Sequence, residues 1–257
     1  MVIFKKLIFA FPFLIAFIGS CLTLKSFLVE PTLILGISQP ALQQMVLFCT
    51  CIILTGLFFI LFATLAQEWK FVFAIIPATT ITSILFLPSS SNFIFAVLCF
   101  LAFGLLYLLL QSKLNAYLTF NPNTLLAPSI TQTVTLLLFV SSVVFYVVVS
   151  ESIKQQGFKI PSSLIDSVIQ FIPNQSLPLP QNLIKATIET QVQSFLKPYL
   201  SFVPFILTVL FFITMKSFSS LLSLFLHPLL WSIFWVLNKT KFTSYVVEMR
   251  EVKKLVV

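Results

Sequence analysis

One stretch of the chain decides the fold: residues 46–66 are VLFCTCIILTGLFFILFATLA. All 21 of these residues are uncharged, and most of them are large and apolar. A helix needs about 20 such residues to cross the hydrocarbon core of a bilayer, because each residue adds only about 1.5 Å of length. The stretch therefore predicts a transmembrane helix.

The same character extends over all 257 residues of the chain. Hydrophobic residues make up 59% of the sequence and charged residues 9%, whereas about 25% of the residues in soluble domains are charged. The mean hydropathy is +1.08. This composition excludes a soluble globular protein and indicates a chain that crosses the membrane several times.

Seven segments are apolar and long enough to span a bilayer, and none of them contains Asp, Glu, Lys or Arg. They are Leu7–Leu24, Val46–Ala66, Phe71–Leu87, Phe93–Leu110, Thr133–Val149, Tyr199–Met215 and Leu221–Leu237. The predicted fold is an all-α, polytopic integral membrane helical bundle of about seven embedded helices.

Turn residues divide this bundle. Residues 88–92, PSSSN, and residues 216–220, KSFSS, each separate two apolar runs and predict tight helical hairpins. The predicted organisation is a five-span bundle over 1–149, an interfacial segment over 150–198, a two-span hairpin over 199–237 and a basic amphipathic tail over 238–257.

The segment 150–198 is the one long polar stretch. Residues 163–166, SLID, match a capping box, and apolar residues at helical spacing follow them as far as Pro173. A second amphipathic pattern covers 184–196 and leads into the sixth span. Because two short helices bury too little surface to fold alone, we expect them to lie on the bilayer, on the rim of the bundle or against a partner protein.

The tail 238–257 repeats apolar residues at spacings of three and four, with charged residues between them. This pattern predicts an amphipathic helix with an apolar stripe. Two roles fit the tail: it binds a partner protein, or it lies on the membrane surface.

The chain has 15 basic and 7 acidic residues and a net charge of +8. Its basic residues lie in loops and tails beside the apolar runs, where they orient the chain and meet anionic lipid. No basic stripe with interleaved aromatic residues is present, so nucleic acid is not an expected partner. Membrane lipid is.

The distribution of basic residues conflicts with a chain that crosses the membrane seven times. Seven crossings put five basic residues on the side of the amino terminus and ten on the other, although Lys5 and Lys6 favour a cytoplasmic amino terminus. If residues 71–87 re-enter instead of crossing, both termini and 150–198 become cytoplasmic, with twelve basic residues inside and three outside. Both topologies stay open at this point.

The polar residues within the spans are few. His227 is the single histidine and precedes Pro228 in the seventh span, while Thr79 and Thr82 belong to the short, hydroxyl-rich third span. Together they form a candidate pathway for a solute or a proton. The alternative is that the histidine bonds to a neighbouring helix and that the hydroxyls bond to their own helix.

The four cysteines lie in or beside apolar runs without the spacing of a metal or redox motif. The amino terminus, with Lys5 and Lys6, an apolar run to Phe17 and then residues 18–21, IGSC, resembles a bacterial lipoprotein signal. This resemblance implies lipidation of Cys21. Against it, the apolar run continues through Leu24, as a retained span does.

No nucleophile elbow, phosphate-binding glycine loop or zinc-protease motif is present, and no carboxylate lies in a span. We therefore expect neither an enzyme nor a cofactor or metal site. The favoured function is a structural, accessory or scaffold subunit of a bacterial cytoplasmic membrane, which contacts lipid or a partner protein through 150–198 and 238–257. The alternative is a passive or weakly coupled channel or transporter for a small or apolar solute.

Overall fold

The structure is a computed structural model of the chain, and it describes residues 7–35, 38–66, 68–87, 89–116, 121–156, 191, 197–240 and 242. These residues form seven α-helices and two 3-10 helices. In chain order they are α2 (Ala10–Val29), η1 (Pro31–Ile34), α3 (Gln39–Ala66), α4 (Trp69–Phe86), α5 (Ser89–Ala116), α6 (Pro122–Gln156), η2 (Lys197–Tyr199), α9 (Val203–Ser223) and α10 (Leu226–Lys239). The predicted all-helical bundle is confirmed.

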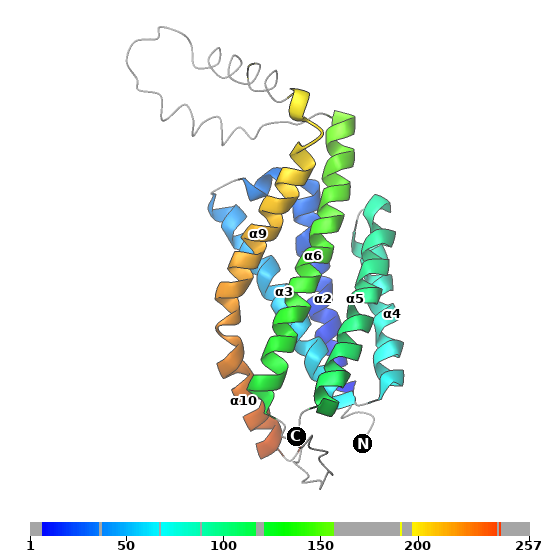
Figure 1. Cartoon of the computed structure of the whole chain (residues 1–257), viewed down its shortest axis with the longest axis vertical. Coiled ribbons are helices and arrows are strands. Elements are labelled where there is room, and N and C mark those ends of the chain that lie inside the picture. The colour runs from blue at the N-terminus through cyan, green and yellow to red at the C-terminus, as the bar shows by residue number, and fades with distance from the viewer. Residues whose placement is uncertain are drawn as a thin grey trace, which may run out of the picture.

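Six of the helices, α2 to α6 and α9, are long and apolar enough to cross a membrane. They run up and down in one elongated bundle, with α3 in its interior and α4 and α9 at its edges (Figure 1). The predicted hairpin of the third and fourth spans is present, since α4 and α5 are antiparallel neighbours joined near Leu87. Residues 69–86 form one continuous helix around Pro77 and not a re-entrant turn.

The predicted hairpin over 199–237 is wrong. Residues 216–220 lie inside α9, and α10 continues from the end of α9 along the same neighbour, α6 (Figure 1). With 14 residues, α10 is too short to cross a bilayer by itself. The described part of the chain therefore holds six helices that are long enough to cross a bilayer, and α2 begins at the same end of the bundle at which α10 ends (Figure 1).

Pro228 explains the break between α9 and α10. Proline has no N–H to donate, and its ring clashes with the carbonyl four residues earlier, here that of Leu224. The helix stops at Ser223, and a new one starts with Pro228 in its first turn, where proline is tolerated. Leu224 and Phe225 form the two-residue junction.

Two clusters of phenylalanine rings fill the core. In the first, Phe103 of α5 contacts Phe13 of α2 and Phe59 of α3, with ring centroids 5.3 and 4.7 Å apart. In the second, Phe211 of α9 stacks on Phe145 of α6 at 4.7 Å. Such aromatic pairs contribute about 0.5–1.5 kcal/mol each, and the two clusters link α2, α3, α5, α6 and α9.

Several predictions about segments fall on residues that the structure does not describe. These are the capping box at 163–166, both amphipathic helices of 150–198, and the tail beyond Phe242.

Candidate functional site

The two threonines of the candidate pathway are buried in α4. Thr79 donates a hydrogen bond to the carbonyl oxygen of Ile76 at 2.6 Å, and Thr82 donates to that of Ala78 at 2.8 Å. Both hydroxyls are thus satisfied by their own helix, which is the usual behaviour of serine and threonine in apolar surroundings.

His227, the third residue of the candidate pathway, does not belong to α4. It occupies the first turn of α10 and is exposed on the surface of the bundle. While α10 packs against α6 and α9, α4 packs against α5, α2 and α3, so the two helices lie on opposite sides of the bundle (Figure 1). The structure does not bring His227 together with Thr79 and Thr82.

Cys21, the residue that the lipoprotein resemblance singles out, is completely buried midway along α2. The helix continues through it to Val29 without a break. Lipidation of Cys21 stays a prediction.

The interior formed by the described residues is largely apolar. Within the described residues no charged side chain and no histidine is buried, and nine of the eleven buried hydroxyls donate to a carbonyl three or four residues earlier in their own helix. No group of three potential metal ligands occurs in this part of the chain. The described core thus has no polar path across the bundle.

The structure reveals a polar feature that the sequence interpretation placed in a turn. Lys216 lies in the second half of α9, and its Nζ donates to Thr135 Oγ1 of α6 at 2.5 Å. From the other neighbouring helix, α5, Lys113 Nζ donates to Gln132 Oε1 of α6 at 2.8 Å. Two lysines from different helices therefore flank one face of α6.

An apolar groove adjoins these lysines. It has a volume of about 460 Å³ and lies between α5 and α6, with Phe212 of α9 at its end. Its lining residues are Leu105, Leu106, Leu109, Thr131, Gln132, Thr135, Leu136, Phe139 and Phe212. Gln132 and Thr135, the two acceptors of the lysines, thus belong to its wall.

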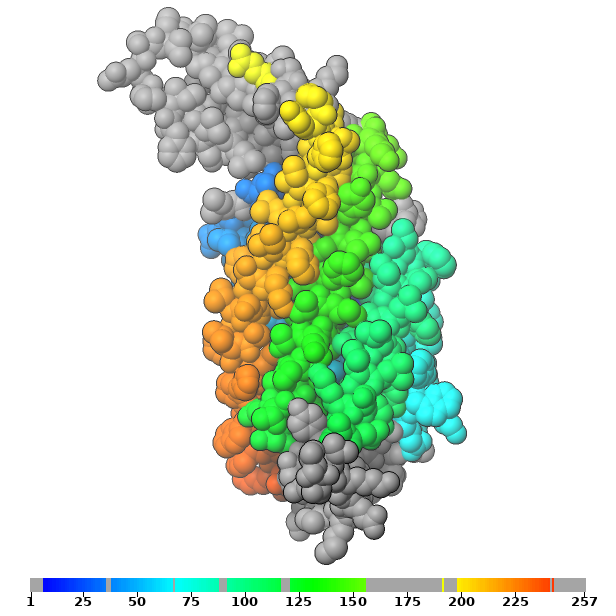
Figure 2. All heavy atoms as spheres, in the orientation of Figure 1, coloured from blue at the N-terminus to red at the C-terminus, as the bar shows by residue number. Residues whose placement is uncertain are grey.

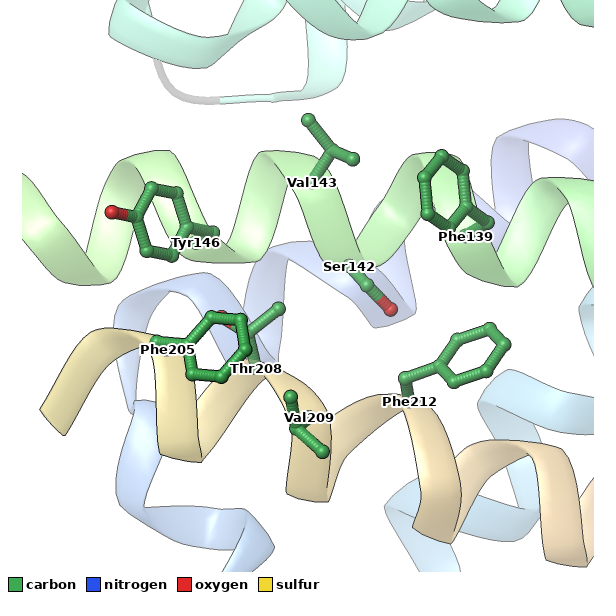
Figure 3. A pocket seen from close by; sticks show the side chains of 8 residues that line it. All are labelled: Phe139, Ser142, Val143, Tyr146, Phe205, Thr208, Val209 and Phe212. Carbon is green, nitrogen blue, oxygen red and sulfur yellow. The ribbon is translucent and has the colours of Figure 1, made fainter. Parts of the chain in front are cut away.

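A second apolar groove continues from the first. It has a volume of about 380 Å³ and lies between α6 and α9, and Phe139 and Phe212 line both grooves (Figure 3). Its other lining residues are Ser142, Val143, Tyr146, Phe205, Thr208 and Val209. Both grooves belong to the face of the molecule that α5, α6 and α9 form (Figure 2).

A third hollow, of about 260 Å³, lies at the end of the bundle where the described chain starts and finishes. The exposed rings of Trp231 and Trp235 line it together with the side chains of Asn121, Asn123 and Asn238. Lys239 Nζ lies 4.7 Å from the ring centroid of Trp235. This mixture of indole rings and amides is typical of a protein interface or of the headgroup level of a bilayer.

Comparisons with protein-family models, with curated proteins and with solved structures gave no match. The function is therefore inferred from the residues of this chain.

Proposed function

We propose that this protein is a structural or accessory subunit, a scaffold, of a bacterial cytoplasmic membrane, and that it contacts lipid and a partner protein without catalysing a reaction. The observation that carries this proposal is the apolar interior of the described residues. A channel or transporter needs polar groups from several helices around a solute, whereas nine of the eleven buried hydroxyls in the described residues donate to carbonyls of their own helices.

Two tryptophans of the described part, Trp231 and Trp235, are exposed side by side on its surface. The hollow beside Trp231 and Trp235 lies at the end of α10, next to the point where the tail leaves the bundle. Aromatic rings are enriched in protein interfaces. We therefore place the contact with a partner protein at this hollow and the tail.

Six membrane crossings also resolve the conflict between the number of crossings and the distribution of basic residues. Each basic residue is assigned to the side at which its nearest helix end lies, and Lys216 is assigned to the half of the bundle that contains it. Ten basic residues then lie on the side of the chain ends, and five lie on the other side. This balance favours cytoplasmic termini, in agreement with Lys5 and Lys6. On this topology the segment 150–198 faces the opposite side.

Deletion of residues 243–257 tests the scaffold role, because it leaves α10 and the hydrogen bond from Phe242 N–H to the Leu237 carbonyl in place. A protein that co-purifies with the full chain after crosslinking in cells should be lost, with loss of at least about 1.4 kcal/mol, or tenfold, in affinity. Co-purification is measured by quantitative mass spectrometry.

Two substituted chains locate the contact within the tail. Replacing Tyr245, Met249 and Val252 with serine removes the apolar stripe, whereas Lys253→Gln and Lys254→Gln removes charge and keeps the stripe. The first variant should behave as the deletion does, and the second should retain the partner. Full co-purification by the deleted chain would refute a scaffold that acts through its tail.

A transport assay examines the competing function. The purified chain in vesicles should show no solute flux that depends on His227, because this residue is exposed and adjoins no polar path in the described part of the chain. Flux is followed with a dye trapped in the vesicles. A flux that the wild-type chain shows and His227→Phe lacks would contradict the scaffold proposal and favour a transporter.

A further inference from the structure

Lys113 and Lys216 lie close together on one face of the bundle. Their acceptors, Gln132 and Thr135, are three residues apart on α6, and residues at this spacing share a helix face with Cβ atoms about 5–6 Å apart. Lys113 reaches this face from α5, and Lys216 reaches it from α9. The structure thus brings two positive charges, from α5 and α9, to one face of α6.

With the membrane location of the proposed function, these charges lie at the edge of the hydrocarbon core, in the half of the bundle nearer the chain ends. Thr135 is sixteen residues from Glu151, which corresponds to about 24 Å along α6. Lys113 is 21 residues from Asn92 at the start of α5, or about 31 Å, close to the thickness of the hydrocarbon core. Lys113 therefore marks the lower boundary of the bilayer, and the Lys216 contact lies slightly inside it.

Within the described residues both ammonium groups bond to neutral oxygens, an amide and a hydroxyl. The described carboxylates, Glu30, Glu68 and Glu151, lie at or near helix ends. An ammonium group has three N–H donors, and a charge at membrane depth is normally paired. We therefore expect an anion to bind to the two lysines.

The grooves next to the lysines accommodate a hydrocarbon chain. Together they extend along α6 from Thr131 to Tyr146, about 22 Å, whereas one leaflet of a bilayer contributes about 15 Å of hydrocarbon. Most of their lining residues are leucine, valine and phenylalanine, with exposed fractions such as 58% for Phe139 and 60% for Phe205. A phosphate at the lysines and an acyl chain in the grooves belong to one kind of molecule.

We propose that the face of α5, α6 and α9 is a binding site for an anionic phospholipid, with the phosphate held by Lys113 and Lys216 and an acyl chain lying along the joined grooves past Phe139 and Phe212. The site deepens the lipid contact of the proposed function and depends on the membrane location in that proposal. It does not depend on the partner protein.

The test uses a tryptophan inside the site as a reporter. Trp69, Trp231 and Trp235 are replaced with phenylalanine, and Phe212→Trp places the one indole where the grooves meet. The full chain is reconstituted into phosphatidylcholine vesicles that contain a small fraction of phosphatidylglycerol. Brominated acyl chains quench tryptophan on contact. In one series the phosphatidylglycerol carries these chains, and in the other series an equal fraction of the phosphatidylcholine carries them.

Phosphatidylglycerol should quench the reporter at a lower mole fraction than phosphatidylcholine, by about fivefold for each lysine, since one lysine near an anionic surface contributes about 1 kcal/mol. Lys113→Gln with Lys216→Gln should abolish this preference. The matched control, Lys25→Gln with Lys70→Gln, removes the same charge from α2 and α4 and should keep it. Lys113→Arg with Lys216→Arg should also keep it, which separates loss of the site from loss of the fold.

Three results would overturn the site. Equal quenching by the two lipids shows that the lysines select no headgroup, and an unchanged preference in the double glutamine variant shows that selection arises elsewhere. Absence of quenching by either lipid shows that protein covers the face, as a partner helix or a second copy would. The vesicles contain this chain alone, so failure of the partner experiment leaves these results interpretable.

Discussion

A cysteine in place of Ser163 and a cysteine in place of Ser244 should react with a membrane-impermeant maleimide from opposite sides of the membrane. One residue precedes η2 and the other follows α10, and a single pass formed by α9 and α10 separates them. Labelling should be all or none at each site. In intact cells Ser163→Cys should be labelled, and Ser244→Cys should react only after permeabilisation.

Ser90→Cys provides the internal control for this experiment. It lies at the start of α5, at the end of the bundle where α6 finishes, and should be labelled together with Ser163→Cys. The background has Cys21, Cys49, Cys51 and Cys99 replaced with alanine, because all four are free thiols. Seven crossings and a re-entrant third span both put Ser163 and Ser244 on the same side, so labelling of the two from one side would disprove the six-pass arrangement.

The second large effect should come from Gly56→Leu. A Cβ atom at Gly56 would lie 3.2 Å from Val134 Cγ2 and 3.5 Å from the Cβ of Thr133, so α3 and α6 meet there through a position without a side chain. The further carbons of leucine would push α6 away. Overpacking of this kind destabilises a protein by about 1–3 kcal/mol, and helix contacts in membranes depend on such close approach.

Gly104→Leu is the matched control, since a Cβ atom at Gly104 on α5 would have no neighbour within 4 Å. Glycine is about 0.8–1.0 kcal/mol less favourable in a helix than alanine, and leucine ranks close to alanine, so this variant should be as stable as the wild type or more stable. The free energy of unfolding is measured by titration with a denaturing detergent. Equal stability of the two variants would mean that α3 and α6 are not in contact at Gly56.

Hydropathy was sufficient to predict the first five spans because their apolar runs are bounded by charged or turn residues. It gave wrong bounds for α6, which starts at Pro122 and not at Thr133. The added turns contain polar residues such as Asn123 and Gln132, but Leu126 and Ile130 on their other face are fully buried. A window average cannot separate these two faces, and the pairing with α10 is a tertiary effect.

The sequence also concealed the lysine pair. Lys216 stands among serines, a composition typical of a turn, yet Ser217 donates to the Ile213 carbonyl at 2.9 Å and remains helical. Phe211, Met215 and Ser219 are buried at intervals of four residues, so the helical spacing passes through 216–220. That spacing is the feature of the sequence that could have predicted a continuous helix through Lys216. The meeting of Lys216 with Lys113 on α6 depends on packing and has no signature in the sequence.

The hydroxyls that bond within their own helices have a consequence for how this chain is made. Each of these helices can leave the insertion machinery with its hydroxyls already satisfied, so no helix has to wait for a polar partner before it enters lipid. Recognition between the buried faces of the helices then depends mainly on the shapes of phenylalanine rings around α3, while the lysine contacts with α6 lie outside the core. The chain thus separates insertion, which each helix can complete alone, from assembly, in which the packing of side chains brings the helices together.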